Sequence, residues 1–451
     1  MPCYLYDMEI RDPVHGPIHI LDEEIPIITH PFFQRLRNIK QLGLSEYVFP
    51  GATHTRFLHS LGVMKVGEKT FDSLFKDYEK NQDLERIKET FKLSCLLHDV
   101  GHAPLSHATE SVMPKLHELK INKKYLSNNE IDDRQATHED YTIKAITDSS
   151  FSASFLLAEK KYGVSKWAVA DLIAGHNRKE TYFKIGKTNY FPLLSQLVSG
   201  ELDCDRMDYL LRDSYFCGVS YGQYDLDWLL DNMHICIEDH EAYLGINEKA
   251  VVTFDDFLLS RYHMFIMVYF HYRSVCLEKI MLKYFKTSPG EYKIPLDIEE
   301  YIEHDDHYLL TVLKKSKNPY AKAVINNQIP EKIYESFNTH QLKTLEEIQK
   351  YLEKNKIDFF RCSSAGRLSK YYVDKNNQEI SHAPPIRVIR TISELTRSKK
   401  MARPKTSLIN KSTDLFQKFS KEHAVDRIHC HLRDLSAKDI EEINLMLSKQ
   451  T

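Results

Sequence analysis

The residues best suited to chemistry are histidines and aspartates that lie far apart in the sequence. His59 stands in the segment Arg-Phe-Leu-His-Ser, His98 and Asp99 are adjacent, and Asp205 lies in Leu-Asp-Cys-Asp-Arg-Met. Two imidazoles and two carboxylates form a mixed nitrogen and oxygen ligand set, which suits Mn, Fe, Zn or Ni and also tolerates Mg. An octahedral ion held by such a set keeps positions for a water and a phosphate oxygen. The sequence therefore predicts a hydrolytic metal site.

The spacing of nearby polar residues favours a shared cleft. His98 and His102 are four residues apart, so a continuing helical turn would place both on one face. Asp205, Tyr209 and Asp213 repeat that interval. A single histidine among the 22 in the chain is most often a core or surface residue, so the prediction depends on the whole set.

Helices are expected to position these residues. Apolar residues at helical spacing predict a helix over Glu85–Leu97 that presents His98 and Asp99 at its end. From Asp255, a suitable N-cap, to Phe285 the chain contains no Pro or Gly, which predicts one long, largely buried helix.

Short strands are expected in two places. Residues 1–28 combine β-compatible pieces with turn formers, which predicts a small hairpin before the first helix. The segment Ile235–Phe254 predicts a second hairpin, with Tyr243-Leu244 and Val251-Val252 as strand residues.

Composition limits the classes of function. With 42% hydrophobic and 28% charged residues and a net charge of -3, the chain is globular and is not built to coat nucleic acid. Its eight cysteines include no CxxC pair, which argues against a zinc ribbon or a secreted disulfide frame. The N-terminus lacks a signal-peptide pattern, and the apolar stretch Met264–Phe270 is too short to cross a bilayer. We expect a cytoplasmic protein with no membrane span.

The length of 451 residues predicts a catalytic domain over 1–289 and a regulatory or oligomerisation lobe over 290–451. Beyond residue 290 the chain becomes richer in Lys and Asn, for example in Lys314–Lys322 and Asp374–Gln378. The segment Thr396–Lys411 carries six basic residues and no acid. It is either a solvated loop or an arm that binds phosphate or another subunit.

Three longer segments add a more specific signal: HPFFQRLRNIKQLGLSEYVFPGATHTRFLHSLGV at 30–63, LLHDVGHAPLSH at 96–107 and LDCDRMDYLLRD at 202–213. Their residues and their order closely resemble the SAM-and-HD-domain dNTP triphosphohydrolase family and its bacterial dGTPase-like relatives. The resemblance covers about Ile10 to Phe285. It implies a mainly α fold, an HD-domain helical core with small β-hairpins and a smaller α+β C-terminal lobe. We expect the bare catalytic form, without a preceding SAM domain.

The resemblance also implies catalytic roles. The four predicted metal ligands match those of the family. His107 and Glu110 resemble its catalytic histidine–carboxylate pair, in which the acid orients the ring and tunes its basicity. His102 and His138 match further active-site histidines, one of which would protonate the departing 5′ oxygen.

Three arginines match the positions that hold the triphosphate, where a guanidinium suits phosphate oxygens better than a point charge does. They are Arg56, Arg206 and Arg261, and family members often carry Lys in place of Arg206. A Mg ion is expected to accompany the triphosphate.

The sugar would meet a second group of residues. Gln41 and Asp213 match the groups that bind the 3′-OH, and Tyr209 resembles the residue beneath the sugar, where a 2′-OH would clash. Tyr269, eight residues beyond Arg261, is expected to face the same pocket. This combination would select deoxynucleotides.

The resemblance is weaker at the nucleotide activator site of the family. Gln34, Arg37 and Val48 match three of its residues. The acid that reads guanine is replaced by Thr29, and Asp227 stands where a later arginine is found. Activation by GTP is therefore not expected, while an activator of other specificity, or none, stays open.

The leading hypothesis is metal-dependent hydrolysis of dNTPs to deoxynucleoside and tripolyphosphate, by a homo-tetramer if the resemblance extends to assembly. One alternative is an HD-type phosphodiesterase or nuclease acting on cyclic or oligonucleotides, since the metal centre serves both chemistries. An alternative of another class is a nucleotide-sensing or nucleic-acid-binding assembly protein, for which the basic segment is the only support.

Overall fold

The computed structural model describes residues 8–125, 134–177, 181–337, 342–366, 371–373, 379–381, 386–390, 405–409, 412–413, 415 and 423–448. The stretch Asp374–Gln378 lies outside the described residues, as does the basic segment Thr396–Lys411 apart from residues 405–409. Within the described ranges no helix combines the length and the apolar character needed to cross a membrane.

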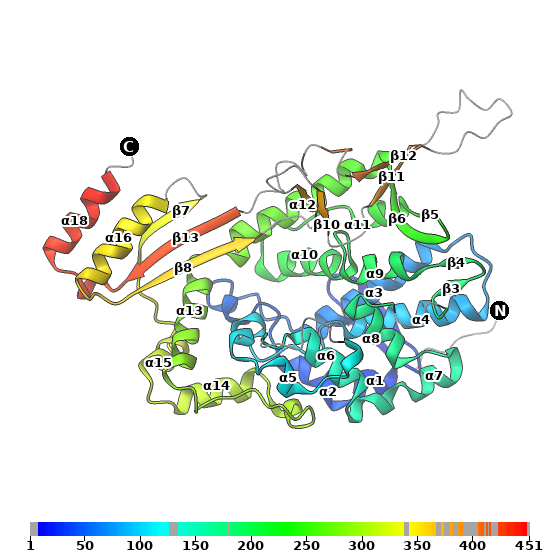
Figure 1. Cartoon of the computed structure of the whole chain (residues 1–451), viewed down its shortest axis with the longest axis horizontal. Helices are drawn as coiled ribbons and strands as arrows, with labels where there is room; N and C mark the ends of the chain where they lie inside the picture. Colours follow the sequence, from blue (N-terminus) through cyan, green and yellow to red (C-terminus); the bar gives the residue numbers. More distant parts are fainter. Residues whose placement is uncertain are drawn as a thin grey trace.

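The fold is mainly α, as predicted, with a helical body and a small sheet at one end (Figure 1). The helices of the body are α1 (Ile25–Thr29), α2 (Pro31–Gln34), α3 (Arg56–Leu74), α4 (Gln82–Leu97), α5 (Leu116–Leu119), α6 (His138–Thr147), α7 (Leu156–Tyr162), α8 (Lys166–Ala174), α9 (Phe191–Ser199), α10 (Cys204–Cys217), α11 (Leu226–Asp231), α12 (Val251–Met264), α13 (Tyr272–Thr287), α14 (Asp306–Lys315) and α15 (Pro319–Ile325).

Helices α3 and α4 lie at the centre of this body because each contributes to two apolar cores. In α3, Leu61 and Met64 pack into one core, whereas Val66 and Phe71 pack into the other. The predicted helix ending at Leu97 is α4, and its N-cap Asn81 accepts a hydrogen bond from the Leu84 amide at 2.9 Å. The two helices therefore carry or directly precede three of the four predicted ligands, His59, His98 and Asp99.

Both predicted hairpins are present. Strands β1 (Met8–Asp12) and β2 (Gly16–Ile20) pair antiparallel, as do β5 (Met233–Glu238) and β6 (Glu241–Asn247). The prediction that Val251-Val252 form a strand is wrong, because these residues begin α12. Further pairings extend the second hairpin into a larger sheet with β3 (Lys184–Ile185), β4 (Thr188–Asn189), β11 (Arg387–Arg390) and β12 (Lys405–Leu408), while β9 (Tyr371–Val373) pairs with β10 (Glu379–Ser381).

The prediction of one long helix over Asp255–Phe285 is also wrong. Asp255 lies inside α12 and accepts a hydrogen bond from Thr413 Oγ1 at 2.7 Å. A π-helical turn over Phe265–Tyr269 ends this helix, and α13 restarts with His271 as its N-cap. The crowded aromatic and β-branched run in that turn disfavours a regular helix, and the inserted turn directs Tyr269 toward Asp213.

The chain beyond residue 290 contributes first to the helical body and then to the separate C-terminal sheet. Helices α14 and α15 pack with the first apolar core of the body. Strands β7 (Glu331–Phe337), β13 (His423–Cys430) and β8 (Phe359–Gly366) form an antiparallel sheet in that order, and α16 (Leu342–Lys354) and α18 (Ala437–Ser448) share a separate core with it (Figure 1). The domain boundary near residue 290 stays a prediction.

A glycine sets the distance between α3 and α10. A Cβ atom placed on Gly62 would overlap with the Asp208 carboxylate and the Arg212 guanidinium of α10. Because both groups are fully buried, neither side chain can swing into solvent to make room. The close approach of these two helices therefore requires glycine at this position.

We expect Gly62→Ala to destabilise the protein by about 1–3 kcal/mol, the usual cost of overpacking a filled interior. The matched control is Gly290→Ala, at an exposed position with open space around the added methyl. Urea unfolding followed by circular dichroism gives both free energies. Equal stability of the two variants would contradict the packing described here.

Candidate metal centre and adjoining pocket

The structure brings together the four predicted metal ligands from three helices. His59 comes from the first turn of α3, His98 and Asp99 follow α4, and Asp205 lies in the first turn of α10. His59 Nε2 lies 3.0 Å from Asp205 Oδ1 and 3.6 Å from Asp99 Oδ2. His98 Nε2 lies 3.4 Å from Asp99 Oδ2 and 3.6 Å from Asp205 Oδ1. Ligand atoms of His59, His98 and Asp205 all lie within 4.8 Å of one another, which suits one ion, and Asp99 lies beside both histidines.

The hydrogen bonds of the two histidines fit a metal site. His59 Nδ1 donates to Asp208 Oδ2 at 2.7 Å, and His98 Nδ1 donates to the Cys95 carbonyl at 2.8 Å. These bonds place the lone pair of each ring on Nε2. Both Nε2 atoms are buried, and neither makes a hydrogen bond within the described part of the chain. A divalent ion would satisfy both.

Asp208 is a supporting residue that the sequence did not single out. It is fully buried and accepts from His59, from His15 Nε2 at 2.6 Å and from Arg212 at 2.8 Å. Burial opposes its ionisation, but the Arg212 charge and the two histidine bonds hold the pKa of Asp208 well below its usual range. Arg212 also donates to Asp12 of β1 at 2.8 Å. The spacing of Asp208 and Arg212, one helical turn apart, is the signal that could have revealed this pair.

The predicted catalytic residues form a second cluster beside the ligands. His107 Nδ1 and His138 Nδ1 both lie 2.9 Å from Glu110 Oε1. The rings of His102 and His138 stack with centroids 3.9 Å apart, and His102 Nε2 lies 3.3 Å from Asp99 Oδ1. All four predicted residues therefore lie in one group at the edge of the candidate metal centre.

The stacked histidines have opposite protonation tendencies. Burial and the nearby charges of Arg56 and His138 hold the pKa of His102 well below its usual range. Burial also lowers the pKa of His138, but its bond to Glu110 and the charge of Asp99 outweigh burial and raise it. Neighbouring groups whose pKa values are driven apart are suited to separate proton-accepting and proton-donating roles.

The segment that carries His107 has a constrained backbone. Leu105 and Ser106 both have a φ of 56°, in the left-handed region that side chains rarely adopt. Asp306 of α14 fixes this turn by accepting from the Leu105 amide at 2.6 Å and from the Lys40 amide at 2.9 Å. Sequence reasoning missed this role, because nothing local connects residue 306 with the turn.

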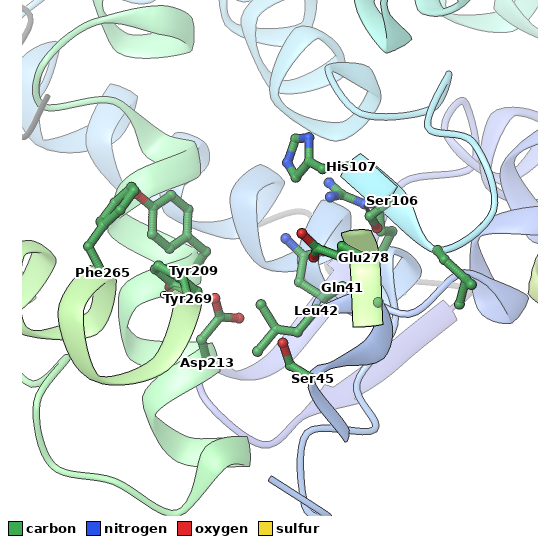
Figure 2. Close-up of a pocket in the computed structure, with 13 residues that line it drawn as sticks. Gln41, Leu42, Ser45, Ser106, His107, Tyr209, Asp213, Phe265, Tyr269 and Glu278 are labelled. Atoms are coloured by element: carbon green, nitrogen blue, oxygen red, sulfur yellow. Dashed lines mark hydrogen bonds between the residues drawn. The ribbon is translucent and has the colours of Figure 1, made fainter. Parts of the chain in front are cut away.

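A cavity of about 350 Å³ adjoins the centre. Its lining includes Gln41, Tyr209, Asp213 and Tyr269, the four residues predicted to meet the sugar. Figure 2 shows Tyr209 and Tyr269 on one side of the pocket, with Gln41 and His107 across from them. Asp213 Oδ2 accepts from the Tyr269 hydroxyl at 2.7 Å, and Asp213 Oδ1 accepts from His54 Nε2 at 2.8 Å. His54 is a further supporting residue that the sequence did not reveal.

The three predicted phosphate-binding arginines are not equivalent. Arg56 lines the cavity, donates to Ser106 Oγ at 2.9 Å and forms a short ion pair with Asp99. Arg206 and Arg261 are outside the lining. Arg206 lies against Asp203 at 3.3 Å, and Arg261 donates to Glu201 at 3.1 Å. Their role toward phosphate stays a prediction.

One of the residues matched to the activator site, Arg37, contacts the helix that carries Arg56. Arg37 is exposed, donates to Gln34 Oε1 at 2.7 Å and covers the Phe57 ring at 3.6 Å. Val48 follows the short helix Gly43–Tyr47. Asp227 pairs with Lys69 at 3.2 Å. Binding of a nucleotide here stays a prediction.

Comparison with known proteins identifies the centre. The HD domain family matches residues 56–213, a range that contains all four predicted ligands. Residues 56–213 of this chain form an HD domain. Its relatives include proteins named deoxynucleoside triphosphate triphosphohydrolase SAMHD1, so the resemblance predicted from the sequence motifs is confirmed.

The relatives of this HD-domain protein match it over most of its length. An uncharacterised protein of Methanocaldococcus jannaschii is 32% identical over 346 residues, which are 77% of this chain and 63% of that protein. Human SAMHD1 is 26% identical over 329 residues, 67% of this chain and 50% of its own. The crystal structure of a hypothetical protein from Aquifex aeolicus covers 97% of this chain and 99% of its own, with a TM-score of 0.70 and 26% identity. The chain thus spans about half to two thirds of the length of these two curated relatives.

We expect Asp208→Asn to weaken metal binding by about 10–100-fold, the usual cost of losing the group that orients a ligating histidine. Asp12→Asn is the matched control, because it weakens the same Arg212 network without touching His59. Isothermal titration calorimetry with Mn²⁺ gives both affinities. Equal losses in the two variants would show that Asp208 acts only through stability.

Metal affinity should rise with pH. Burial lowers the pKa of His59, but the adjacent carboxylates of Asp205 and Asp208 outweigh burial and raise the pKa to about 10. The carboxylates of Asp99 and Asp205 similarly raise the pKa of His98 against burial. Since an imidazolium cannot bind a metal, each ring must lose its proton first. Binding should tighten about tenfold per pH unit for each proton released. Calorimetric titrations at several pH values check this, and an affinity that falls as pH rises would contradict it.

Proposed function

We propose that this HD-domain protein hydrolyses deoxynucleoside triphosphates to deoxynucleoside and tripolyphosphate. The observation that carries the proposal is the position of Arg56. It pairs with Asp99 of the metal centre and also lines the cavity that holds the predicted sugar-binding residues. A nucleotide whose sugar occupies that cavity would therefore present its α-phosphate, the group next to the sugar, to the metal centre.

The residues of the centre would have different roles in hydrolysis. A divalent ion held by His59, His98, Asp99 and Asp205 would make water more acidic and polarise the phosphate oxygens. Arg56 would stabilise negative charge that develops on the α-phosphate. Arg206 and Arg261 would bind the outer phosphates, with Mg, once the substrate replaces their present carboxylate partners.

Two histidines are placed to move protons. His107 lines the cavity and is held by Glu110 through Nδ1, so its Nε2 is free to accept a proton from the attacking water. His138 has a raised pKa and is the better proton donor of the stacked pair. Attack at the α-phosphorus forms one P–O bond and breaks the bond to the 5′ oxygen, which takes the donated proton. The products are a deoxynucleoside and tripolyphosphate.

The resemblance to SAMHD1 proteins also suggests a homo-tetramer with a nucleotide activator. Gln34, Arg37 and Val48 would belong to the activator site, with a specificity other than that of a guanine-reading site because Thr29 replaces the acid. Assembly and activation are proposals that come from the family alone, whereas the cytoplasmic location is a proposal that comes from the cysteine pattern and the N-terminal sequence.

The direct test incubates the protein with each dNTP, singly and in mixtures, with Mg²⁺ or Mn²⁺, and identifies the products by chromatography. We expect deoxynucleoside and tripolyphosphate, and no activity in Asp99→Ala. Release of deoxynucleoside monophosphate and pyrophosphate would overturn the proposal. Preferred cleavage of a cyclic dinucleotide or an oligonucleotide would instead support the phosphodiesterase alternative.

Sugar selectivity gives a second test. If Tyr209 packs beneath the sugar and Gln41 and Asp213 bind its 3′-OH, a 2′-OH must clash or lose a partner, at about 1–3 kcal/mol. We expect kcat/KM for dATP to exceed that for ATP by at least about tenfold. Asp213→Ala should lower kcat/KM for every dNTP by a similar factor, whereas Asp231→Ala, at an exposed site, should change none. Equal turnover of ATP and dATP would refute the sugar pocket.

A further inference from the structure

Another cluster of metal-binding residue types, separate from the two described above, lies between the helical body and the C-terminal sheet. Cys276 comes from α13, Cys362 from β8 and His429 from β13. One ligand atom of each lies within 4.8 Å of the others, and all three residues are buried. None of the three belongs to the HD centre or lines its pocket.

The strand register explains how two of these residues meet. In the antiparallel pair of β8 and β13, Cys362 lies opposite Arg427, and His429 follows Arg427 by two residues. Side chains at such diagonal positions share one face of the sheet. The pairing of β13 with β7 shifts between Ile428 and His429, and irregularities of this kind redirect a side chain. Because Cys276 on α13 packs in the same apolar core as Cys362, the helix supplies the third member.

His429 has the hydrogen bonding expected of a metal ligand. Its side chain is completely buried, and Nδ1 donates to the Pro330 carbonyl at 3.2 Å. That bond leaves the lone pair on Nε2, which makes no hydrogen bond within the described ranges. An unpartnered nitrogen in a dry interior is costly unless a ligand satisfies it.

The two cysteines can supply thiolate ligands to the same ion. Both are free cysteines, and their sulfur atoms belong to the group of ligand atoms that lie within 4.8 Å of one another. Two thiolates would neutralise the charge of a divalent ion. The nearby cations Arg427 and Lys332 are already paired with Glu335, at 2.6 Å each.

We propose that Cys276, Cys362 and His429 bind a thiophilic transition-metal ion, with zinc as the best match to two sulfurs and one imidazole. Tetrahedral zinc places such ligand atoms about 3.5–3.8 Å apart, given bond lengths of about 2.3 Å to sulfur and 2.1 Å to nitrogen. The observed grouping within 4.8 Å needs only a small contraction to reach that arrangement. The HD centre offers nitrogen and oxygen ligands only, so the two sites differ in the metals that they prefer.

The ion would cross-link α13 of the helical body to strands β8 and β13 of the C-terminal sheet. Cys276 lies on α13 two residues before Glu278, which lines the nucleotide pocket, so the same helix faces the pocket and the sheet. A metal bound only by the folded arrangement adds its binding free energy to stability. The site lies apart from the HD centre and its pocket, and its existence does not depend on the proposed hydrolase activity.

Cobalt substitution of the full-length protein under reducing conditions tests the proposal. Thiolate ligands give Co²⁺ an intense near-ultraviolet charge-transfer absorption, which nitrogen and oxygen ligands do not give. We expect one equivalent of Co²⁺ to produce this band in the wild type and in His98→Ala, where the HD centre is impaired. The Cys276→Ser and Cys362→Ser double variant should lose the band, and His429→Ala should weaken it. Cys430→Ser, next to His429 on β13 but outside the cluster, should keep it.

Measuring the zinc content tests the proposal without mutating Cys276, Cys362 or His429. In the His98→Ala background, we expect one zinc per chain, and removal by a chelator should lower the melting temperature by several degrees, with recovery on adding Zn²⁺. Absence of the cobalt band in the wild type, or its persistence in the double cysteine variant, would overturn the proposal. Mass spectrometry of protein purified in the presence of a reductant would also overturn the proposal if it found Cys276 and Cys362 joined by a disulfide.

Discussion

The buried carboxylate of Asp208 is the interaction on which the centre depends. It joins α10 to α3 through His59, and it joins both helices to the N-terminal hairpin through His15 and through Arg212 with Asp12. A charge in this position is stable only because three donors surround it, and removing any one would leave a buried group without a partner. The absence of a side chain at Gly62 gives these groups their room. The candidate metal ligand His59 on α3 is thus positioned by charge neutralisation in the interior, rather than by its own helix alone.

Arg56 and Asp99 connect this centre to the pocket. Their ion pair balances one carboxylate of the ligand set and holds a guanidinium at the boundary between the metal ligands and the cavity. Asp306 of α14 restrains the turn at Leu105 and Ser106, which carries the second bonding partner of Arg56. Residues beyond position 290 therefore help to shape the candidate site, even though the family match ends at residue 213.

Much of the fold and the site could be predicted from local patterns. The helix ending at Leu97, both hairpins and the regular spacing of Asp205, Tyr209 and Asp213 on α10 follow from periodicity and turn chemistry, which are properties of neighbouring residues. The break between α12 and α13 could not be predicted, because it contains neither Pro nor Gly and depends on packing around Tyr269. The roles of Asp208, His54 and Asp306 depend on contacts between distant segments. The cluster of Cys276, Cys362 and His429 could not be predicted for the same reason. Its members are 67 or more residues apart and form no CxxC pattern.

The central claim is that water attacks the α-phosphorus and that the bond to the 5′ oxygen breaks. Hydrolysis of a dNTP in water labelled with a heavy oxygen isotope, with mass spectrometry of both products, tests it most directly. The account predicts one labelled oxygen in tripolyphosphate and none in the deoxynucleoside. Label in the deoxynucleoside would mean attack at the sugar carbon, and label in a nucleoside monophosphate or in pyrophosphate would mean cleavage between phosphates. Either result would contradict the account.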